Sequence, residues 1–186
     1  MKRFSTSCLG FVALFALGSA LNASPILGDQ LFTLPGGARV QVDVLRSSSG
    51  FSNPIGLYEE TSPGVFDLVQ PIGIDNQIDT VDLGIFPGGQ ELIFGIQSPQ
   101  GLFLMGPGGR NPDGIPHAYV DALSMNRAIV SFEDLRGGGD NDFNDAIIRV
   151  RQVPVPEPTS LALLGMMVLA SGAAAYRGRR SRKVIL

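Results

Sequence analysis

The chain of 186 residues contains no tryptophan, one cysteine and one histidine. A disulfide framework, a cysteine-based zinc site and a histidine-rich metal site are therefore excluded. Lysine is also scarce: residues 24–153 contain seven arginines, no lysine and sixteen acidic residues, a net charge of −9. Because nucleic-acid binding needs lysine and arginine to neutralise phosphates, this segment is a poor nucleic-acid binder. Its negative charge favours the binding of cations instead.

The first 23 residues have the order of a secretory signal peptide. Lys2 and Arg3 supply the charge, Cys8–Leu17 is apolar, and small residues follow, with cleavage expected after Ala20 or Ala23. The apolar run is short for a membrane span. The alternative is a buried N-terminal helix. Removal of a signal peptide would leave the mature protein without cysteine.

The C-terminal segment, residues 154–186, combines three features in order. The motif Pro156-Glu157-Pro158 comes first, and its prolines hold it extended. An apolar stretch over residues 159–176 follows and reaches the lower end of membrane-spanning length, about 17 residues. A basic cluster at 177–183 completes the segment. We expect a transmembrane helix over 159–176, with the basic cluster in the cytoplasm. Residues 24–153, the body of the protein, would then lie outside the membrane.

This order of motif, span and basic cluster resembles the PEP-CTERM sorting signal of bacterial exported proteins. The resemblance implies that an exosortase, a membrane transpeptidase-like enzyme, recognises Pro156, Glu157 and Pro158 and removes the tail. The body would then pass to the cell surface or the extracellular matrix. The trailing Val184-Ile185-Leu186 departs from the family pattern. A permanent single-span anchor is the alternative, and it also places the body outside.

Residues 24–153 are predicted to form one all-β domain. Short apolar or alternating runs are separated by Gly- and Pro-rich turns, and no long amphipathic helix pattern occurs between the ends. About nine short strands favour an antiparallel, jelly-roll-like β-sandwich, flanked by the N-terminal signal helix and the C-terminal transmembrane helix. The expected strands are 39–45, 55–58, 65–69, 80–85, 91–96, 102–105, 118–123, 128–132 and 146–153. The core candidates are Phe66, Leu92, Phe94, Phe103 and Phe132.

The segment Ser131–Val150 carries the strongest chemistry. Glu133, Asp134, Asp140, Asp142 and Asp145 place five carboxylates within thirteen positions. Asp140, Asp142 and Asn144 have the spacing of the first three oxygen donors of a calcium loop, and three preceding glycines let the chain fold these donors inward. It is not an EF-hand, because position six is Asp145 and position twelve is Arg151.

Calcium needs six to eight oxygens, so further donors would come from Glu133, Asp134 or the segment 111–114. The alternative is a solvated acidic turn whose Asp and Asn side chains cap their own backbone. Phe143, inside the motif, is expected to anchor the loop to the core.

The same residues resemble a bacterial domain family of unknown function, found in exported β-rich surface proteins. The resemblance lies in an E-D-L, a glycine run and D-N-D-F-N-D, preceded by N-P-D-G-I-P-H-A at 111–118, and covers roughly residues 85–153. It implies a β-sandwich at the cell exterior. By motif it also implies a calcium site at Asp140, Asp142, Asn144 and Asp145, with Glu133 and Asp134 near it.

No enzyme activity is expected. His117 lacks a G-x-S-x-G partner and is expected to make a structural hydrogen bond to the acidic loop. Glu59, Glu60 and Glu133 could in principle supply a glycosidase pair, but Glu59 and Glu60 precede a turn where solvated charge is ordinary.

The resulting expectation is an exported, exosortase-processed, calcium-stabilised protein of the cell surface or exopolysaccharide matrix, with a structural or adhesive role. The alternative is a carbohydrate-binding module of that matrix. Such a module usually offers an aromatic platform, and the body contains only Tyr58 and Tyr119 as tyrosines.

Overall fold

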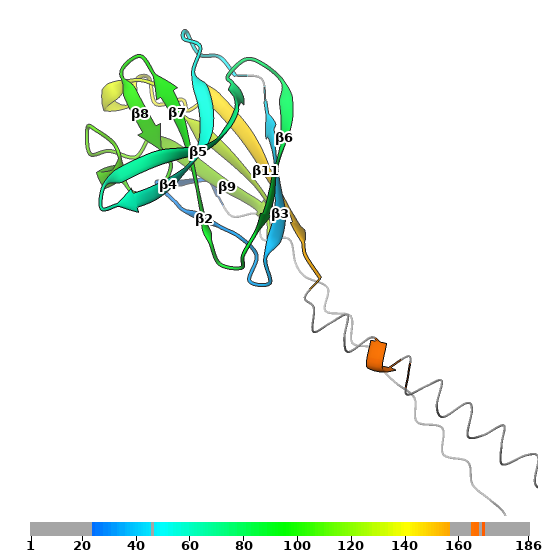
Figure 1. The fold of residues 1–186 in the computed structure, drawn as a ribbon. Helices are drawn as coiled ribbons and strands as arrows, with labels where there is room; N and C mark the ends of the chain where they lie inside the picture. The colour runs from blue at the N-terminus through cyan, green and yellow to red at the C-terminus, as the bar shows by residue number, and fades with distance from the viewer. Residues whose placement is uncertain (1–23, 46, 157–164, 168, 170–186) are drawn as a thin grey trace, which may run out of the picture.

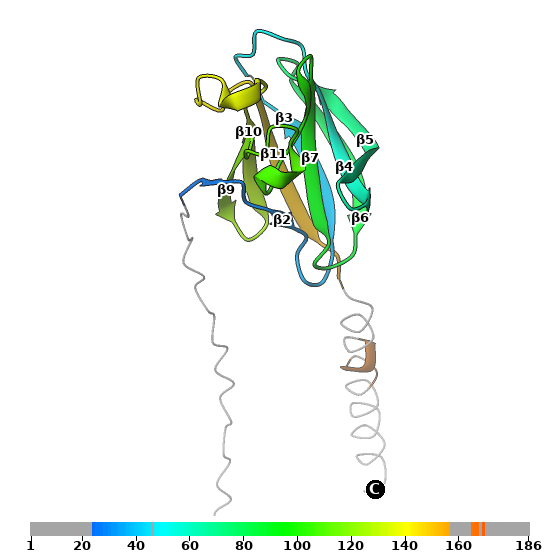
Figure 2. The ribbon, with the colours of Figure 1, turned by 90° about the vertical axis from the view of Figure 1, so that its left-hand side faces the viewer.

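The computed structural model describes residues 24–45, 47–156, 165–167 and 169. Two antiparallel sheets pack face to face in this part of the chain (Figures 1 and 2). The predicted signal peptide, Glu157 and Pro158 of the sorting motif, most of the span at 159–176 and the basic tail lie outside the described residues. Within the described residues, no helix has the length and apolar character needed to cross a membrane.

The larger sheet has six strands in the order β1-β9-β10-β11-β3-β6. The smaller sheet has the order β2-β7-β4-β5, and β8 also pairs with β7. Two short 3-10 helices, η1 (Gly108–Arg110) and η2 (Arg136–Gly138), lie in the loops. The strands are β1 (Ile26–Leu27), β2 (Leu31–Phe32), β3 (Ala38–Val44), β4 (Pro54–Ser62), β5 (Val65–Ile74), β6 (Asp79–Phe86), β7 (Glu91–Ser98), β8 (Gly101–Leu104), β9 (Ala118–Ser124), β10 (Arg127–Phe132) and β11 (Ala146–Pro154).

The predicted antiparallel β-sandwich is confirmed, and each of the nine predicted strands is present. The prediction missed β1 and β2, because two-residue strands are too short to show a periodic pattern. The jelly-roll description and the terminal helices stay predictions.

The core lies between the sheets and is built from alternating side chains. Val40, Val42 and Val44 of β3 are fully buried, as the period of two predicts. Leu92, Phe94, Phe103 and Phe132 are also fully buried, as expected. Phe66 was predicted wrongly as a core residue. It is half-buried on the projecting part of the β4–β5 hairpin, and the Arg110 guanidinium lies 5.8 Å from its ring centroid.

The acidic loop, residues 133–145, joins β10 to β11 at one end of the sandwich (Figures 1 and 2). Phe132 pairs with Ala146, and the Asp145 N–H donates to Phe132 O at 3.2 Å, so the loop leaves and re-enters the sheet at adjacent points. β11 then runs the length of the sandwich and ends at Pro154. The acidic loop and the start of the sorting motif therefore lie at opposite ends of the body.

Candidate metal centre

The acidic loop is tightly curled by residues with positive φ. Gly137, Gly138 and Gly139 have φ values of 76°, 83° and 48°. Asn141 and Phe143 are also left-handed, at 61° and 52°. Residues that carry a Cβ disfavour positive φ, whereas glycine adopts it readily. The three glycines therefore permit the sharp turn ahead of Asp140. The expected role of the glycine run therefore agrees with the backbone geometry.

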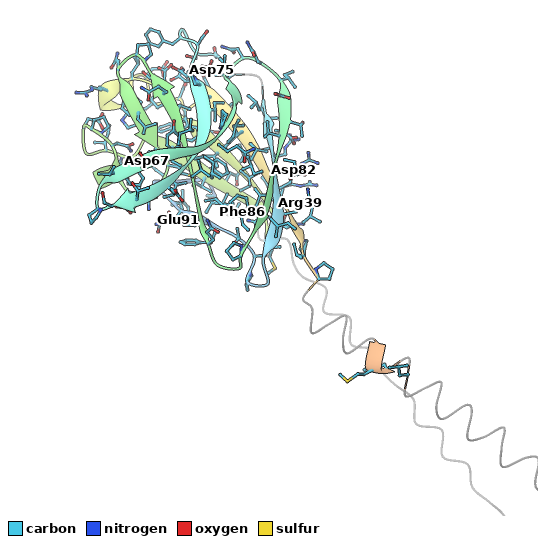
Figure 3. The ribbon with its side chains drawn as sticks, in the orientation of Figure 1. Arg39, Asp67, Asp75, Asp82, Phe86 and Glu91 are labelled. Atoms are coloured by element: carbon cyan, nitrogen blue, oxygen red, sulfur yellow. The ribbon has the colours of Figure 1, made fainter. Side chains whose placement is uncertain are left out.

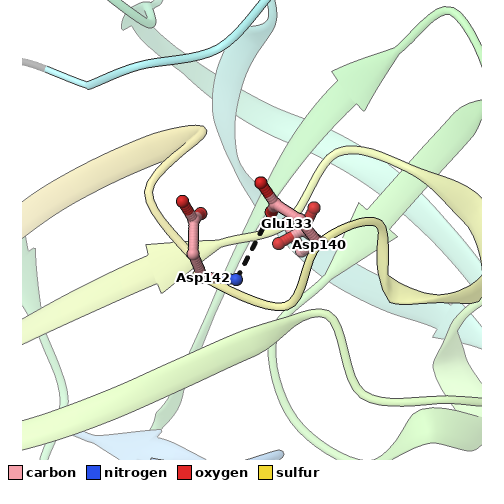
Figure 4. Close-up of side chains that lie close together, drawn as sticks. All are labelled: Glu133, Asp140 and Asp142. Carbon is pink, nitrogen blue, oxygen red and sulfur yellow. Dashed lines mark hydrogen bonds between the residues drawn. The ribbon is translucent and has the colours of Figure 1, made fainter.

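The curl gathers the carboxylates of Glu133, Asp140 and Asp142 (Figure 4). Each offers one oxygen within 4.8 Å of the others. Glu133 directly follows β10 and is 1% exposed, whereas the two aspartates are exposed. The Asp142 N–H donates to Asp140 Oδ1 at 3.4 Å, the dashed line of Figure 4. A cluster of this kind can hold a metal ion, because one buried and two exposed carboxylates converge on one space.

Hydrogen bonds and packing hold the cluster in place. The Phe143 N–H donates to Glu133 Oε2 at 3.3 Å. The Phe143 side chain is 7% exposed, and its ring meets that of Tyr119 edge-on at a centroid distance of 4.5 Å. Phe143 therefore anchors the loop to the larger sheet, through Tyr119 rather than through the core cluster between the sheets, where it was expected.

The charge of the cluster is not balanced by the described basic residues. Arg136, the basic residue inside the acidic loop, donates through Nε to Gln100 O at 3.1 Å and pairs with no carboxylate. Burial raises the pKa of Glu133 to about 7, and the Asp145 and Asp140 carboxylates add to this rise. Burial also raises the pKa of Asp145, with a further contribution from Asp134. A cation is the group that would relieve this repulsion.

The other predicted ligands take different positions. Asn144 lies beside the cluster: its amide Nδ2 and its backbone N–H both donate to the Asp142 carboxylate. Asp145 Oδ2 accepts the Asp134 N–H at 3.0 Å. Asp134 points away from the cluster, because successive side chains of an extended chain alternate in direction. Of the six predicted ligands, the structure brings three together, places Asn144 and Asp145 at their border and puts Asp134 elsewhere.

The segment 111–114, considered as a source of donors, has structural contacts instead. Asn111 Oδ1 accepts the Leu104 N–H at 2.7 Å. His117 is fully buried, stacks on Phe103 and bridges Glu133 O to Asp113 through its two ring nitrogens, at 3.0 and 2.9 Å. Asp113 Oδ2 also accepts the Gly137 N–H at 2.9 Å. His117 therefore supports the acidic loop by a hydrogen bond to Glu133 O, as expected. Asp113 makes a second connection, because it contacts both His117 and the Gly137 N–H.

Sequence reasoning missed a second polar group, which surrounds Asp134. Asp134 Oδ2 accepts hydrogen bonds from Ser49 Oγ at 2.6 Å and Asn53 Nδ2 at 2.8 Å. Asn53 Nδ2 also donates to Asp75 Oδ2 at 2.8 Å. Asn53 and Asp75 flank the β4–β5 hairpin, whose register pairs Pro54 with Ile74. The residues flanking two strands come together only once the strands are paired, so no local pattern reveals this group.

A groove lies beside the acidic loop on the outer face of the larger sheet. It has a volume of about 440 Å³. Tyr119 and Phe143 supply aromatic surface, and Asp121 and Asp142 supply carboxylates. Pro25, Ile129 and Ser131 complete its lining. The groove thus shares Asp142 with the acidic cluster. Tyr58, the other tyrosine of the body, lines a different and smaller hollow.

Comparison with known proteins finds one family that is similar to part of the chain. Residues 91–152 match a family described as Domain of unknown function (DUF4114). The match runs from β7 to β11 and includes His117 and the whole acidic loop. It leaves out Asn53 and Asp75. No curated protein matches the chain. The body of this protein therefore contains a region similar to a β-rich domain family whose function is unknown.

Proposed function

We propose that this is an exported protein of the cell surface or extracellular matrix, with a structural or adhesive role, whose β-sandwich is stabilised by calcium at the acidic loop. The observation that carries the proposal is the convergence of Glu133, Asp140 and Asp142 within 4.8 Å. Among the described residues, none of the three forms an ion pair. Calcium accepts six to eight oxygens from flexible loops, and extracellular modules bind it with dissociation constants of about 10⁻⁴–10⁻³ M.

Calcium would stabilise the fold by removing repulsion that exists only when the loop is closed. Asn144 supplies an amide oxygen at the border of the cluster, and Asp145 lies close enough to raise the pKa of Glu133. Binding to the folded state alone contributes about 2.7 kcal/mol at a hundredfold excess over the dissociation constant. We assign the domain no catalytic role.

Thermal unfolding of the full chain in detergent, with calcium and with chelator, tests this proposal. Calcium should raise the melting temperature by several degrees. The double variant D140N/D142N should lose the rise, because it removes two of the three converging carboxylates. E59Q, an exposed substitution on β4, should keep it. Equal melting temperatures of the wild type in the two conditions would contradict calcium binding at the loop.

We further propose that an exosortase-type enzyme processes the tail at Pro156-Glu157-Pro158. The order of motif, apolar span and basic cluster in the sequence supports this, and β11 supplies a structural argument. The Val155 N–H donates to Gly37 O at 3.4 Å, and Pro156 after it is exposed. Hydrogen bonding to the body thus reaches as far as Val155, the residue before the motif. A processing enzyme could reach the motif without unfolding the sandwich.

The groove beside the acidic loop favours carbohydrate binding as a second candidate function. Tyr119 offers a ring face, and Asp121 and Asp142 offer acceptors for sugar hydroxyls. The tilt of Phe143 against Tyr119 holds that ring in place. Exopolysaccharide of the matrix is the ligand class this candidate implies.

A glycan array probed with the full chain distinguishes the two candidates. Binding that Y119A abolishes while Y58A does not would support the carbohydrate-binding module. Absence of binding by a folded, calcium-responsive protein would support the structural role.

A further inference from the structure

We propose a second divalent-cation site, formed by Ser49, Asn53, Asp75 and Asp134 and separate from the acidic cluster. The site takes a hard cation with oxygen ligands, and we commit to Ca²⁺. Its residues come from three loops: Ser49 and Asn53 precede β4, Asp75 follows β5, and Asp134 follows β10. Figure 3 shows Asp75 at the end of β5 remote from Asp67.

Two buried carboxylates face each other here across one amide. Asp75 and Asp134 are each 2% exposed, and Asn53 is fully buried between them. Asn53 Nδ2 lies 2.8 Å from Asp75 Oδ2 and 2.8 Å from Asp134 Oδ2. No described arginine or lysine forms an ion pair with either aspartate. Two buried negative charges without a cation are unfavourable, and a divalent ion would neutralise both.

The hydrogen bonds of Asn53 point to a ligand independently of the charges. Its amide nitrogen has two hydrogens but faces three acceptors, because Ser49 Oγ also lies 3.1 Å away. Ser49 already donates its hydroxyl proton to Asp134 Oδ2 at 2.6 Å. Meanwhile Asn53 Oδ1 is buried and accepts no hydrogen bond from the described residues. A buried amide oxygen without a donor is costly.

A bound cation would give Asn53 Oδ1 a partner and would take up the acceptors that the two amide hydrogens cannot all satisfy. Rotating the amide of Asn53 by half a turn exchanges its oxygen and nitrogen, which are nearly equal in shape. Oδ1 then lies among Asp75, Asp134 and Ser49, where it joins three other oxygens. Without a cation, this orientation would place Asn53 Oδ1 against the acceptor oxygens of Asp75, Asp134 and Ser49, which is unfavourable. Four protein oxygens leave the remaining positions of a calcium ion for water or backbone carbonyls.

Calcium titration calorimetry of the full chain in detergent measures the number of ions bound. We expect two per chain in the wild type. The variant D140N/D142N, which disables the acidic cluster, should bind one, and adding D75N should reduce this to none. D67N removes the same charge from an exposed position on β5 and should still leave two ions bound. N53D should keep the second ion, because a carboxylate replaces the amide oxygen.

Three outcomes would overturn the second site. A wild type that binds one ion, lost in D140N/D142N, would leave only the acidic cluster, so the proposed function would survive. A second ion that persists in both D75N and D134N would place it elsewhere. Calcium-dependent folding lost in D75N without loss of an ion would indicate a purely structural role.

Discussion

Gly139 packs directly against the carboxylate of Glu133. A Cβ placed on Gly139 would lie well inside van der Waals contact with Glu133 Oε1, and the residue also has a φ of 48°. The absence of a side chain at position 139 is therefore what lets the loop close over the buried glutamate. The glycine run and the acidic cluster are two parts of one arrangement.

Substituting individual glycines by alanine should destabilise the protein to different degrees, according to the space around the new Cβ and the sign of φ. G139A should destabilise the protein and abolish the calcium-dependent rise in melting temperature, because the methyl group displaces Glu133. G137A has free space around its Cβ but a φ of 76°, so it should cost only about 1–2 kcal/mol. G109A, with free space and no positive φ, should be neutral. Thermal unfolding measures all three, and a G139A variant as calcium-responsive as the wild type would contradict the packing argument.

The stability of the metal-free protein should fall as the pH rises from about 5 to 7. The pKa of Glu133 is about 7 in the folded state, against an ordinary value of 4.5. Between these values the folded state holds a proton that the unfolded state has released, so raising the pH favours unfolding. One such proton limits the slope to about 1.4 kcal/mol per pH unit. E133Q in chelator should flatten the profile when unfolding is followed across this range.

The same profile has a control and a counter-result. E59Q changes an exposed carboxyl and should leave the slope in place. A metal-free wild type whose stability is flat or rises between pH 5 and 7 would contradict the buried, protonated state of Glu133. Calcium should oppose the loss at neutral pH, because the ion replaces the proton.

His117 should be required for stability rather than for any reaction. H117F keeps a ring that can stack on Phe103 but removes the two hydrogen bonds to Glu133 O and Asp113. Leaving the buried Glu133 O unsatisfied, together with the loss of the bond to the partly exposed Asp113, should cost about 1–3 kcal/mol in denaturant unfolding. H117Q, which retains polar atoms, should lose less. A stability of H117F equal to the wild type would show that the bracing hydrogen bonds contribute nothing.

Mass spectrometry of the protein recovered from cells should show that both ends are missing. The expected start is Leu21 or Ser24, and the expected end is near Pro156. The reason is the signal-peptide pattern at one end and the exposed motif beyond the last hydrogen bond of β11 at the other. Peptides from Leu161–Arg177 in the mature protein would instead support a permanent anchor.

The sequence by itself determined most of the fold. Alternating or short apolar runs between Gly- and Pro-rich turns located β3 and eight other strands, because a sheet buried on one face imposes a period of two and turns favour glycine and proline. It also located the acidic loop and its glycines, since those residues are contiguous. It misplaced Phe66, because a strand pattern does not show where a hairpin projects beyond the opposite sheet.

Tertiary structure alone decided how the acidic residues are divided. Neighbours in sequence, Glu133 and Asp134, face different groups: one joins Asp140 and Asp142, the other joins Asn53. Asn53 and Asp75 are 22 positions apart and meet because β4 and β5 pair. The spacing of donor residues in a sequence describes a single loop. A binding site can instead take its side chains from several loops that the sheets bring to the same end of the domain. That selection depends on strand register and packing, which no local pattern encodes.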